Sequence, residues 1–569
     1  MKITKSIARL AVTAGLTATL SFGGVMAPVT MAFAEDAAAT ANGSVTITNV
    51  EGNHTEFDGY QIFKADVATD GNKTVVSNIT WANDGVKAAV EKVIKDKDTN
   101  YAGKTAQDAA DWITNKVTGA DKTTRVDSKH IAYLIAAEVD NLTEKKTTTN
   151  GVASSLEHGY WLFVTKAKTI GDGEAGTSPI FTVVGSNPVD ITEKTGIPTV
   201  EKKIVSDADG QEHDAADSQI GQDVTYNLYG TVAENFDKYD TYFYEFSDQI
   251  SKGLTLQEGA KVYLYKNKND AKADLARTKG TDITTNFIKS TDAAAEDGSI
   301  TTKWTCDNLK TVEGVTKDSY IVVSYTARIN EHAIVAGTKS NDNAVILKYS
   351  NNPMDKDSKG QTPPDAVKDY TYGLRINKVD LGTETKLPNA QFTITTKGDK
   401  DNEQVKYVDD KGKLSTNEVI LNTNDDGVIT LTGLDAGVYT VKEVSAPDGY
   451  TAVDPFTFTI KPTMTDDGPA AGLTEVTGEL NTSQRTKVIA GLNDTSAGKV
   501  GDNKLDFKEG TLTNTDGTFN ITVGDTKQIN LPLTGLNGVT FTWIAGGAVL
   551  CIGVAHLIRS RKRDEGSEE

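Results

Sequence analysis

Short runs in which apolar and polar residues alternate recur along most of the chain, and this pattern constrains the fold more than any other feature. Examples are residues 45–48, 224–228 and 456–460, and clusters of Gly, Asp and Asn separate such runs. A period of two is typical of half-buried β-strands, and many short strands between turn signals are typical of sandwiches. The sequence therefore predicts a mostly β fold built from tandem immunoglobulin-like β-sandwich domains.

Helical periodicity occurs only near the N-terminus. Apolar residues fall on one helical face within residues 86–94, 106–117 and 131–139. The first domain is therefore expected to be a β-sandwich with inserted helices.

Two Pro-bearing joints divide the chain. One covers residues 195–199, and the other is the polar, Pro-rich stretch 350–364. A chain of 569 residues is expected to hold three or four domains at about 150 residues each. We predict three modules, at residues 35–197, 198–368 and 369–530.

The composition excludes several functions. Lys and Arg number 59 against 79 Asp and Glu, and the resulting charge of −20 disfavours nucleic-acid binding. The two cysteines, Cys306 and Cys551, lie far apart, and the six histidines are scattered. We therefore expect no disulfide framework, no bound metal and no cofactor. An enzyme is the least favoured reading, because no nucleophile–base pair or phosphate loop stands out.

The N-terminus has the pattern of a secretory signal peptide. Basic residues precede a long apolar stretch, and small residues stand just before Glu35. We predict a signal peptide at residues 1–34, cleaved between Ala34 and Glu35; an uncleaved membrane anchor is the alternative. The mature chain is then exported.

The C-terminus, residues 531–569, has three parts in order. A pentapeptide comes first, residues 536–558 then carry no Asp, Glu, Lys or Arg, and a basic cluster follows at 559–563. The middle stretch is long enough to span a ~30 Å hydrocarbon core, and the basic cluster would remain cytoplasmic. Taken alone, this is a one-span membrane anchor. The pentapeptide is Leu531, Pro532, Leu533, Thr534 and Gly535.

The second and third modules each begin with a strand that places a lysine among apolar residues. Alternate strand residues share a face, so Lys202 lies beside Ile204, and Lys378 lies beside Ile376. Lys203 falls on the opposite face. Buried lysines are rare unless paired, and a lysine that reaches solvent from a strand end is the alternative.

The third module also contains carboxyl side chains that alternate in step with apolar residues along their strands. Tyr439, Val441 and Glu443 share one face of a predicted strand, and Asp525 shares the face of Val523 in the last strand. Parity alone leaves the opposite facing open, with Glu443 in solvent.

Together these features resemble the sortase-assembled major pilins, or fimbrial shaft subunits, of Gram-positive bacteria. The resemblance rests on three features. They are the LPxTG-like pentapeptide with the apolar stretch and basic cluster after it, the signal peptide, and the two modules whose first strand carries a lysine among apolar residues. It implies that a sortase cleaves between Thr534 and Gly535, and that lysines within the modules form isopeptide bonds with Asn or Asp side chains. It also implies a C-terminal domain of prealbumin- or immunoglobulin-like fold.

The resemblance assigns roles to particular residues. Lys378 matches the reactive lysine of the third module, Glu443 matches its helper acid, and Asp525 stands where an Asn is usual. Asn520 has the wrong parity to replace it.

In the second module, the resemblance implies that Lys202 pairs with Asn343 and that Asp248 is the helper acid. Asn341 and Asn351 are the alternatives to Asn343.

The resemblance further implies an acceptor lysine near the end of the first module. The usual Tyr-Pro-Lys-Asn form is absent, and Lys194 stands at the corresponding place. Lys166 and Lys168 are the alternatives.

The expected function is the major structural subunit of a covalently polymerised, peptidoglycan-anchored surface fimbria that supports adhesion. Its expected partners are sortase, further copies of itself, minor pilins, peptidoglycan and host surface receptors. A wall-anchored adhesin or minor pilin that does not polymerise is the alternative.

Overall fold

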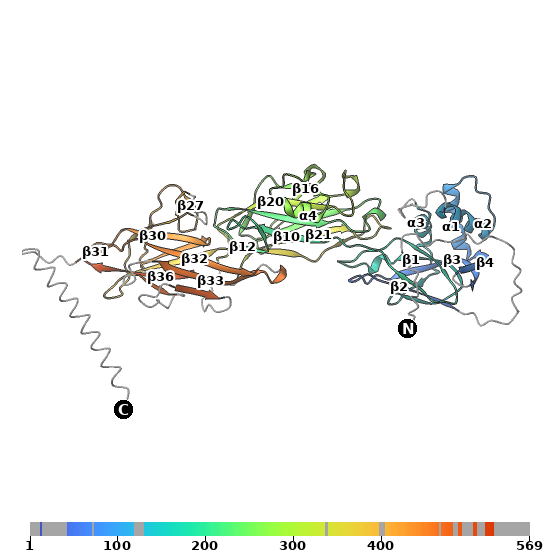
Figure 1. Ribbon diagram of the computed structural model, residues 1–569, viewed down its shortest axis with the longest axis horizontal. Helices are drawn as coiled ribbons and strands as arrows, with labels where there is room; N and C mark the ends of the chain where they lie inside the picture. Colours follow the sequence, from blue (N-terminus) through green and yellow to red (C-terminus); the bar gives the residue numbers. More distant parts are fainter. Residues whose placement is uncertain are drawn as a thin grey trace, which may run out of the picture.

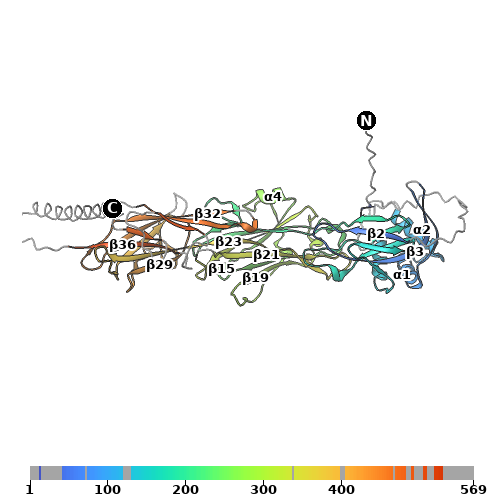
Figure 2. The same ribbon diagram turned by 90° about the horizontal axis from the view of Figure 1, so that it is seen from below.

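The protein is described by a computed structural model that covers residues 12–13, 42–70, 73–118, 130–335, 339–397, 404–465, 468–481, 488–491, 504–508 and 518–528. Three β-rich modules follow one another along the long axis of the molecule (Figure 1). A view turned by 90° shows the same row, so the described part of the chain is a rod (Figure 2). The predicted mostly β, multi-sandwich fold is confirmed.

The first module packs two sheets together and covers one of them with helices. The buried residues Val45, Phe57, Trp161 and Ile191 fill the space between the sheets. One sheet contains, in order, β1 (Val12–Thr13), β9 (Val189–Thr192), β2 (Gly43–Thr48) and β6 (Val152–Leu156). The other contains β4 (Lys73–Trp81), β3 (Phe57–Asp70), β7 (Gly159–Thr165) and β8 (Ile180–Val184), with β5 (Lys146–Thr147) beside β3.

The predicted helices are confirmed as α1 (Asp84–Lys97), α2 (Ala106–Thr118) and α3 (Ile131–Val139). Asn83 caps α1, because its side chain accepts a hydrogen bond from the amide of Val86. Apolar residues of all three helices share one core with Tyr60, Ile62 and Leu162 of the second sheet. The helices therefore bury the face of that sheet that points away from the sandwich.

The second module is a sandwich with a continuous apolar core. One sheet has the order β11 (Glu212–His213), β10 (Val200–Val205), β13 (Asp223–Thr231), β20 (Tyr320–Ile329), β16 (Lys261–Tyr265) and β17 (Thr281–Asp282), with β15 (Leu254–Leu256) beside β20. The other has β12 (Ala215–Asp217), β23 (Asp365–Tyr370), β21 (Asn341–Ser350), β14 (Tyr244–Ile250), β19 (Ile300–Cys306) and β18 (Ile288–Thr291), with β22 (Lys359–Gln361) beside β21. The short helix α4 (Lys268–Ala273) places Ala271 in a small outer cluster with Tyr229 and Tyr265.

The third module is also a sandwich with its own core. One sheet has the order β29 (Val428–Leu434), β24 (Tyr372–Asp380), β36 (Thr518–Lys527) and β31 (Tyr450–Thr451), with β34 (Val488–Gly491) beside β36. The other has β27 (Leu414–Ser415), β26 (Lys406–Val408), β25 (Gln391–Thr396), β30 (Gly437–Ser445), β32 (Phe456–Thr465), β33 (Gly472–Asn481) and β35 (Lys504–Lys508), with β28 (Leu421–Asn422) beside β25.

Close backbone contacts join the second and third modules. The amide of Ile220 donates to the carbonyl oxygen of Gly433 (2.9 Å), and the Gln219 side chain donates to the carbonyl oxygen of Gly412. Strand β23 continues to Tyr370 and β24 begins at Tyr372, so Thr371 alone separates the two sheets along the chain.

Candidate functional site

The second module brings Lys202, Asp248 and Asn343 together in its core. Lys202 comes from β10 in one sheet, whereas Asp248 and Asn343 come from the adjacent strands β14 and β21 of the other. All three side chains are buried, with at most 1% of each residue exposed. The alternation of β10 places Lys202 beside Ile204 on the inner face, as the sequence predicts.

Hydrogen bonds connect the three groups. The Lys202 Nζ donates to Oδ1 of Asn343 (2.5 Å) and to Oδ1 of Asp248. The Tyr325 hydroxyl donates to Oδ2 of Asp248 (2.5 Å) and accepts from Nδ2 of Asn343 (2.8 Å). Lys202 Nζ also lies 3.1 Å from the Tyr325 hydroxyl oxygen.

Burial shifts both ionisable partners towards their neutral forms. It lowers the pKa of Lys202 to about 8, although the Asp248 carboxyl opposes this shift. It also raises the pKa of Asp248, against the opposing effect of Lys202. A neutral amine can therefore face a protonated acid and an amide carbonyl, and this arrangement suits attack of the amine on the amide.

The alternative residues of the second module lie elsewhere. Lys203 is half-buried, and its Nζ contacts Asp214 at 2.5 Å. Asn341 is held by the backbone of Ile334 and Asp369. The Asn351 side chain accepts a hydrogen bond from Ser358.

The third module contains a second buried cluster, made of Lys378, Glu443 and Asp525. Lys378 and Asp525 lie on β24 and β36, which pair in parallel, and Glu443 comes from β30 in the facing sheet. The Lys378 Nζ donates to Oε2 of Glu443 (3.0 Å) and to Oδ1 of Asp525. All three side chains are fully buried.

Glu443 faces inward, so the orientation that the sequence left open is now decided. Tyr439 and Val441 are buried on the same face of β30, while Val438 and Val444 are exposed on the other. Burial raises the pKa of Glu443 to about 7, and the nearby Lys378 opposes this shift. Glu443 Oε2 also accepts a hydrogen bond from the amide of Val453 (2.9 Å), which fixes the carboxyl beside the lysine.

Asn520 is buried on β36, but it lies an odd number of residues from Asp525 and therefore faces the opposite side of the strand. It pairs with Arg375, whereas Asp525 pairs with Asp380. Its side chain has no hydrogen-bond partner within the described residues.

The three candidate acceptor lysines differ in their surroundings. Lys194 follows β9 and is exposed, and its backbone carbonyl accepts a hydrogen bond from Thr177 (3.0 Å). Lys166 is half-buried and pairs with Glu56 at 3.0 Å. Lys168 is exposed in the short 3-10 turn Ala167–Thr169.

Glu193 anchors the chain immediately before Lys194. It is buried and accepts hydrogen bonds from the Val50 amide (2.9 Å) and the Asn53 side chain (2.6 Å). Lys194 therefore projects from a backbone segment that its neighbour fixes.

Tyr325 is the residue of the second site that sequence reasoning missed. The alternation of β20 predicts that it points inward, but it is one of several tyrosines that do so. Which of these tyrosines meets Lys202 depends on the pairing of β10, β13 and β20, and local sequence does not specify that pairing.

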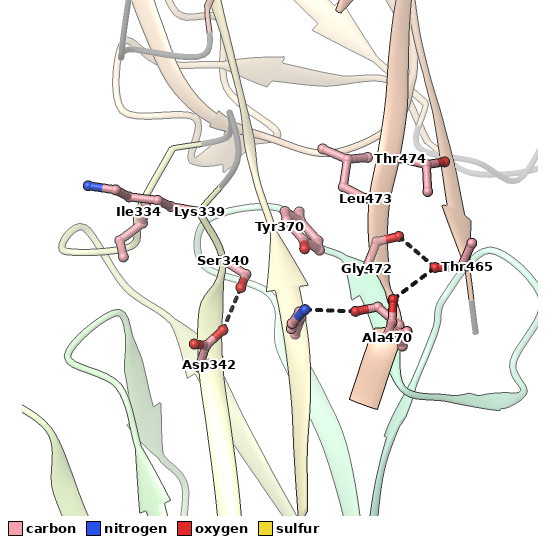
Figure 3. Close-up of a pocket in the computed structure, with 12 residues that line it drawn as sticks. Ile334, Lys339, Ser340, Asp342, Tyr370, Thr465, Ala470, Gly472, Leu473 and Thr474 are labelled. Carbon is pink, nitrogen blue, oxygen red and sulfur yellow. Dashed lines mark hydrogen bonds between the residues drawn. The ribbon is translucent and has the colours of Figure 1, made fainter. Parts of the chain in front are cut away.

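A pocket of about 430 Å³ lies where the second and third modules meet (Figure 3). Lys368 enters it from β23 and donates to the carbonyl oxygen of Ala471 (2.8 Å). The pocket contains none of the predicted site residues. Within the described part of the chain, no group of three His, Cys, Asp or Glu side chains could hold a metal ion.

Two predicted segments lie outside the described residues. One is the signal peptide with its cleavage point between Ala34 and Glu35, of which only residues 12–13 are described. The other is the sorting pentapeptide 531–535 with the apolar and basic stretches that follow it. Among the helices that are described, none is long and apolar enough to cross a membrane.

Part of the third module matches a known family model. Residues 373–469 match the SpaA family model, described as a prealbumin-like fold domain. This segment begins in β24 and includes both Lys378 and Glu443. The third module is therefore similar to SpaA prealbumin-like domains over residues 373–469.

Part of the chain is similar to a surface protein of Streptococcus pyogenes. It is 26% identical over 271 residues to the trypsin-resistant surface T6 protein of Streptococcus pyogenes serotype M6, covering 45% of this chain and 44% of the relative. The chain thus spans less than half the length of this curated relative. The SpaA match and this relative confirm the predicted likeness to Gram-positive pilins.

Solved structures of pilins resemble this chain at lower identity. The T6 backbone pilin of S. pyogenes is 18% identical, with a TM-score of 0.47, over 86% of this chain and 98% of that one. The major pilin SpaD of Corynebacterium diphtheriae is 16% identical, with a TM-score of 0.41, over 86% of this chain and 97% of that one.

Proposed function

We propose that this chain is the shaft subunit of a covalently polymerised, wall-anchored fimbria, and that its second and third modules each form one internal isopeptide bond. The observation that carries the proposal is that each module buries a lysine against an Asn or Asp side chain and a second carboxyl group. These are the only buried lysines of the described residues. A buried lysine without a chemical role would cost stability, because its charge is taken out of water.

The bond in the second module joins Lys202 Nζ to Cγ of Asn343 and releases ammonia. The neutral amine is the nucleophile, and Asp248 is the helper acid that takes a proton from the amine and supplies one for the leaving group. In the third module, Lys378 condenses with Asp525 and releases water, with Glu443 as the helper acid. Each module reacts once with itself, so the chain is a structural protein and does not turn over.

The two bonds would close long loops. Their ends lie 141 and 147 residues apart in sequence. In the chain-entropy model, a cross-link that closes a loop of about 100 residues stabilises the fold by about 4.7 kcal/mol, and longer loops gain slightly more.

Polymerisation would use Lys194, at the end of the first module, and the sorting pentapeptide that follows the third module. Sortase would cleave the pentapeptide after Thr534 and transfer the Thr534 carbonyl to Lys194 of another copy. Head-to-tail joining of this kind does not close on itself and gives a filament. Minor pilins, peptidoglycan and host receptors are the further partners that we propose, and the signal peptide 1–34 would direct export to the cell surface.

Wall extracts of cells that carry the gene test this function. We expect a ladder of high-mass species that resists boiling in SDS, and we expect Thr534→Ala to remove it. A single monomer-sized band from the wild-type chain would reject the shaft function and favour a wall-anchored adhesin.

A further inference from the structure

We propose that Tyr325 is a catalytic residue of bond formation in the second module, where its hydroxyl passes a proton from Asp248 to the departing nitrogen of Asn343. This inference rests on the proposed bond between Lys202 and Asn343. Its hydroxyl contacts all three groups that react: Asp248 Oδ2 at 2.5 Å, Asn343 Nδ2 at 2.8 Å and Lys202 Nζ at 3.1 Å.

The ring of Tyr325 is fixed in place. It stacks against Tyr226, with ring centroids 5.5 Å apart, and against Trp304 at 5.4 Å. Tyr325 is 3% exposed, so bulk water cannot easily replace its hydroxyl as a proton carrier. Burial and the nearby Asp248 raise its pKa far above the usual range, so the hydroxyl keeps its proton and can only relay one.

The Lys202 Nζ attacks Cγ of Asn343 and forms the new C–N bond, and it gives one proton to Oδ1 of Asp248. Attack at Cγ makes Nδ2 a basic amine, and the Tyr325 hydroxyl, which donates to Oδ2 before the reaction, rotates to donate to Nδ2. The Oδ2 proton of Asp248 then passes to the Tyr325 oxygen while the Tyr325 proton passes to Nδ2. The bond from Cγ to Nδ2 then breaks and ammonia leaves; Asp248 and Tyr325 end in the protonation states in which they began.

The third module provides an internal contrast. Its acceptor is Asp525, and the aromatic ring near Lys378 is Phe392, whose centroid lies 5.6 Å from Nζ. Oδ2 of Asp525 and Oε1 of Glu443 have no hydrogen-bond partner within the described residues. Among the described residues, a hydroxyl therefore contacts the reacting groups of the second module, whereas none contacts Oδ2 of Asp525 or Oε1 of Glu443 in the third.

Time-resolved mass spectrometry of refolding tests this role. Chains covering residues 35–530 are purified unfolded before any bond forms, refolded by dilution, and digested to follow each cross-link separately. We expect Tyr325→Phe to slow the ~17 Da loss of the second module by at least about 100-fold, the usual effect of removing a proton-transfer group. The ~18 Da loss of the third module should keep its wild-type rate in the same molecules.

Tyr226→Phe is the matched control. It removes a phenol hydroxyl from the neighbouring stacked ring, and that hydroxyl bonds Asp369 and none of the reacting groups. Both variants are also made with Lys202→Met, so that their thermal stability is compared without a cross-link. An equal slowing by both variants, or a wild-type rate in Tyr325→Phe, would overturn the relay while leaving the bond itself intact.

A second measurement covers the case in which Tyr325→Phe does not fold. The wild-type rate is measured in mixtures of H₂O and D₂O. Transfer of more than one proton predicts a curved dependence on the deuterium fraction, and a linear dependence would overturn the relay. Absence of any ~17 Da loss from the wild-type second module would instead reject the proposed Lys202–Asn343 bond.

Discussion

Lys378 and Asp525 lie on neighbouring parallel strands, and their register is offset by two residues: Lys378 pairs with Val523, and Asp525 pairs with Asp380. Both side chains therefore point to the same face of the sheet, one pleat apart, and their polar atoms meet. In the second module, Asp248 and Asn343 have the equivalent offset on β14 and β21, because Asp248 pairs with Val345. Both modules thus place two polar side chains of the site on neighbouring strands with a two-residue offset. In the third module these side chains are the lysine and Asp525, whereas in the second they are Asp248 and Asn343.

The folded chain should be lighter than its sequence mass. Residues 35–530, expressed without signal and anchor, should weigh about 35 Da less than the sequence mass, through loss of one ammonia (~17) and one water (~18). Intact-mass spectrometry measures this. A loss of only ~17 or only ~18 Da would mean that one of the two proposed bonds does not form, and an unchanged mass would reject both bonds.

Glu443→Gln should abolish the ~18 Da loss alone. The amide keeps the shape of the side chain and can still accept from the Val453 amide, but it cannot carry the proton. Lys461→Arg, which changes an exposed lysine paired with Glu479, is the control and should leave both losses unchanged. A persisting ~18 Da loss in Glu443→Gln would remove Glu443 from the mechanism.

The rates of the two reactions should respond to pH in opposite directions. The folded pKa of Lys202 is lowered to about 8, so its neutral fraction increases as pH rises from 6 to 8. The rate in the second module should therefore increase over the part of this range in which Asp248, whose pKa burial raises, keeps its proton. The folded pKa of Glu443 is raised to about 7, so its protonated fraction, and the rate in the third module, falls above pH 7. Refolding at several pH values with mass detection measures both rates. Parallel pH profiles would contradict the assigned roles.

Lys194→Arg should remove the polymer ladder while leaving the folded subunit and its two mass losses intact. Guanidinium remains protonated and is not a nucleophile, whereas the charge at this exposed position is preserved. Lys166→Arg and Lys168→Arg are the matched controls and should retain the ladder. Loss of the ladder in one of these, with a normal ladder in Lys194→Arg, would move the acceptor to that residue.

Gly433→Ala should loosen the joint between the second and third modules. Gly433 has a φ of +70°, and an added Cβ would lie 2.0 Å from Cδ1 of Ile220. Gly449→Ala is the control, because it has a φ of +86° but nothing within 4 Å of the added atom. Small-angle scattering should show a wider spread of shapes for Gly433→Ala alone; equal profiles would show that the joint tolerates the clash.

Much of this architecture could be predicted from sequence because its signals are local. Alternation placed Lys202, Lys378 and Asp525 on inward faces, and helical periodicity located α1 to α3. Which strands lie opposite one another depends on long-range pairing, which no local pattern encodes. That is why Tyr325 was missed, and why the facing of Glu443 stayed open until the burial of Tyr439 and Val441 decided it.

The position of Lys194 has a consequence for how the fibre bears load. It lies at the end of the first module, after β9 and before β10. If the next subunit is attached there, a pulling force acts on the chain between Lys194 and the C-terminus. The first module, which precedes Lys194, then carries none of this force. The two buried lysines of the described residues both lie within the stressed segment. The proposed isopeptide bonds thus lie in the part of the chain that bears the tension. The surface of the first module can therefore change without weakening the fibre.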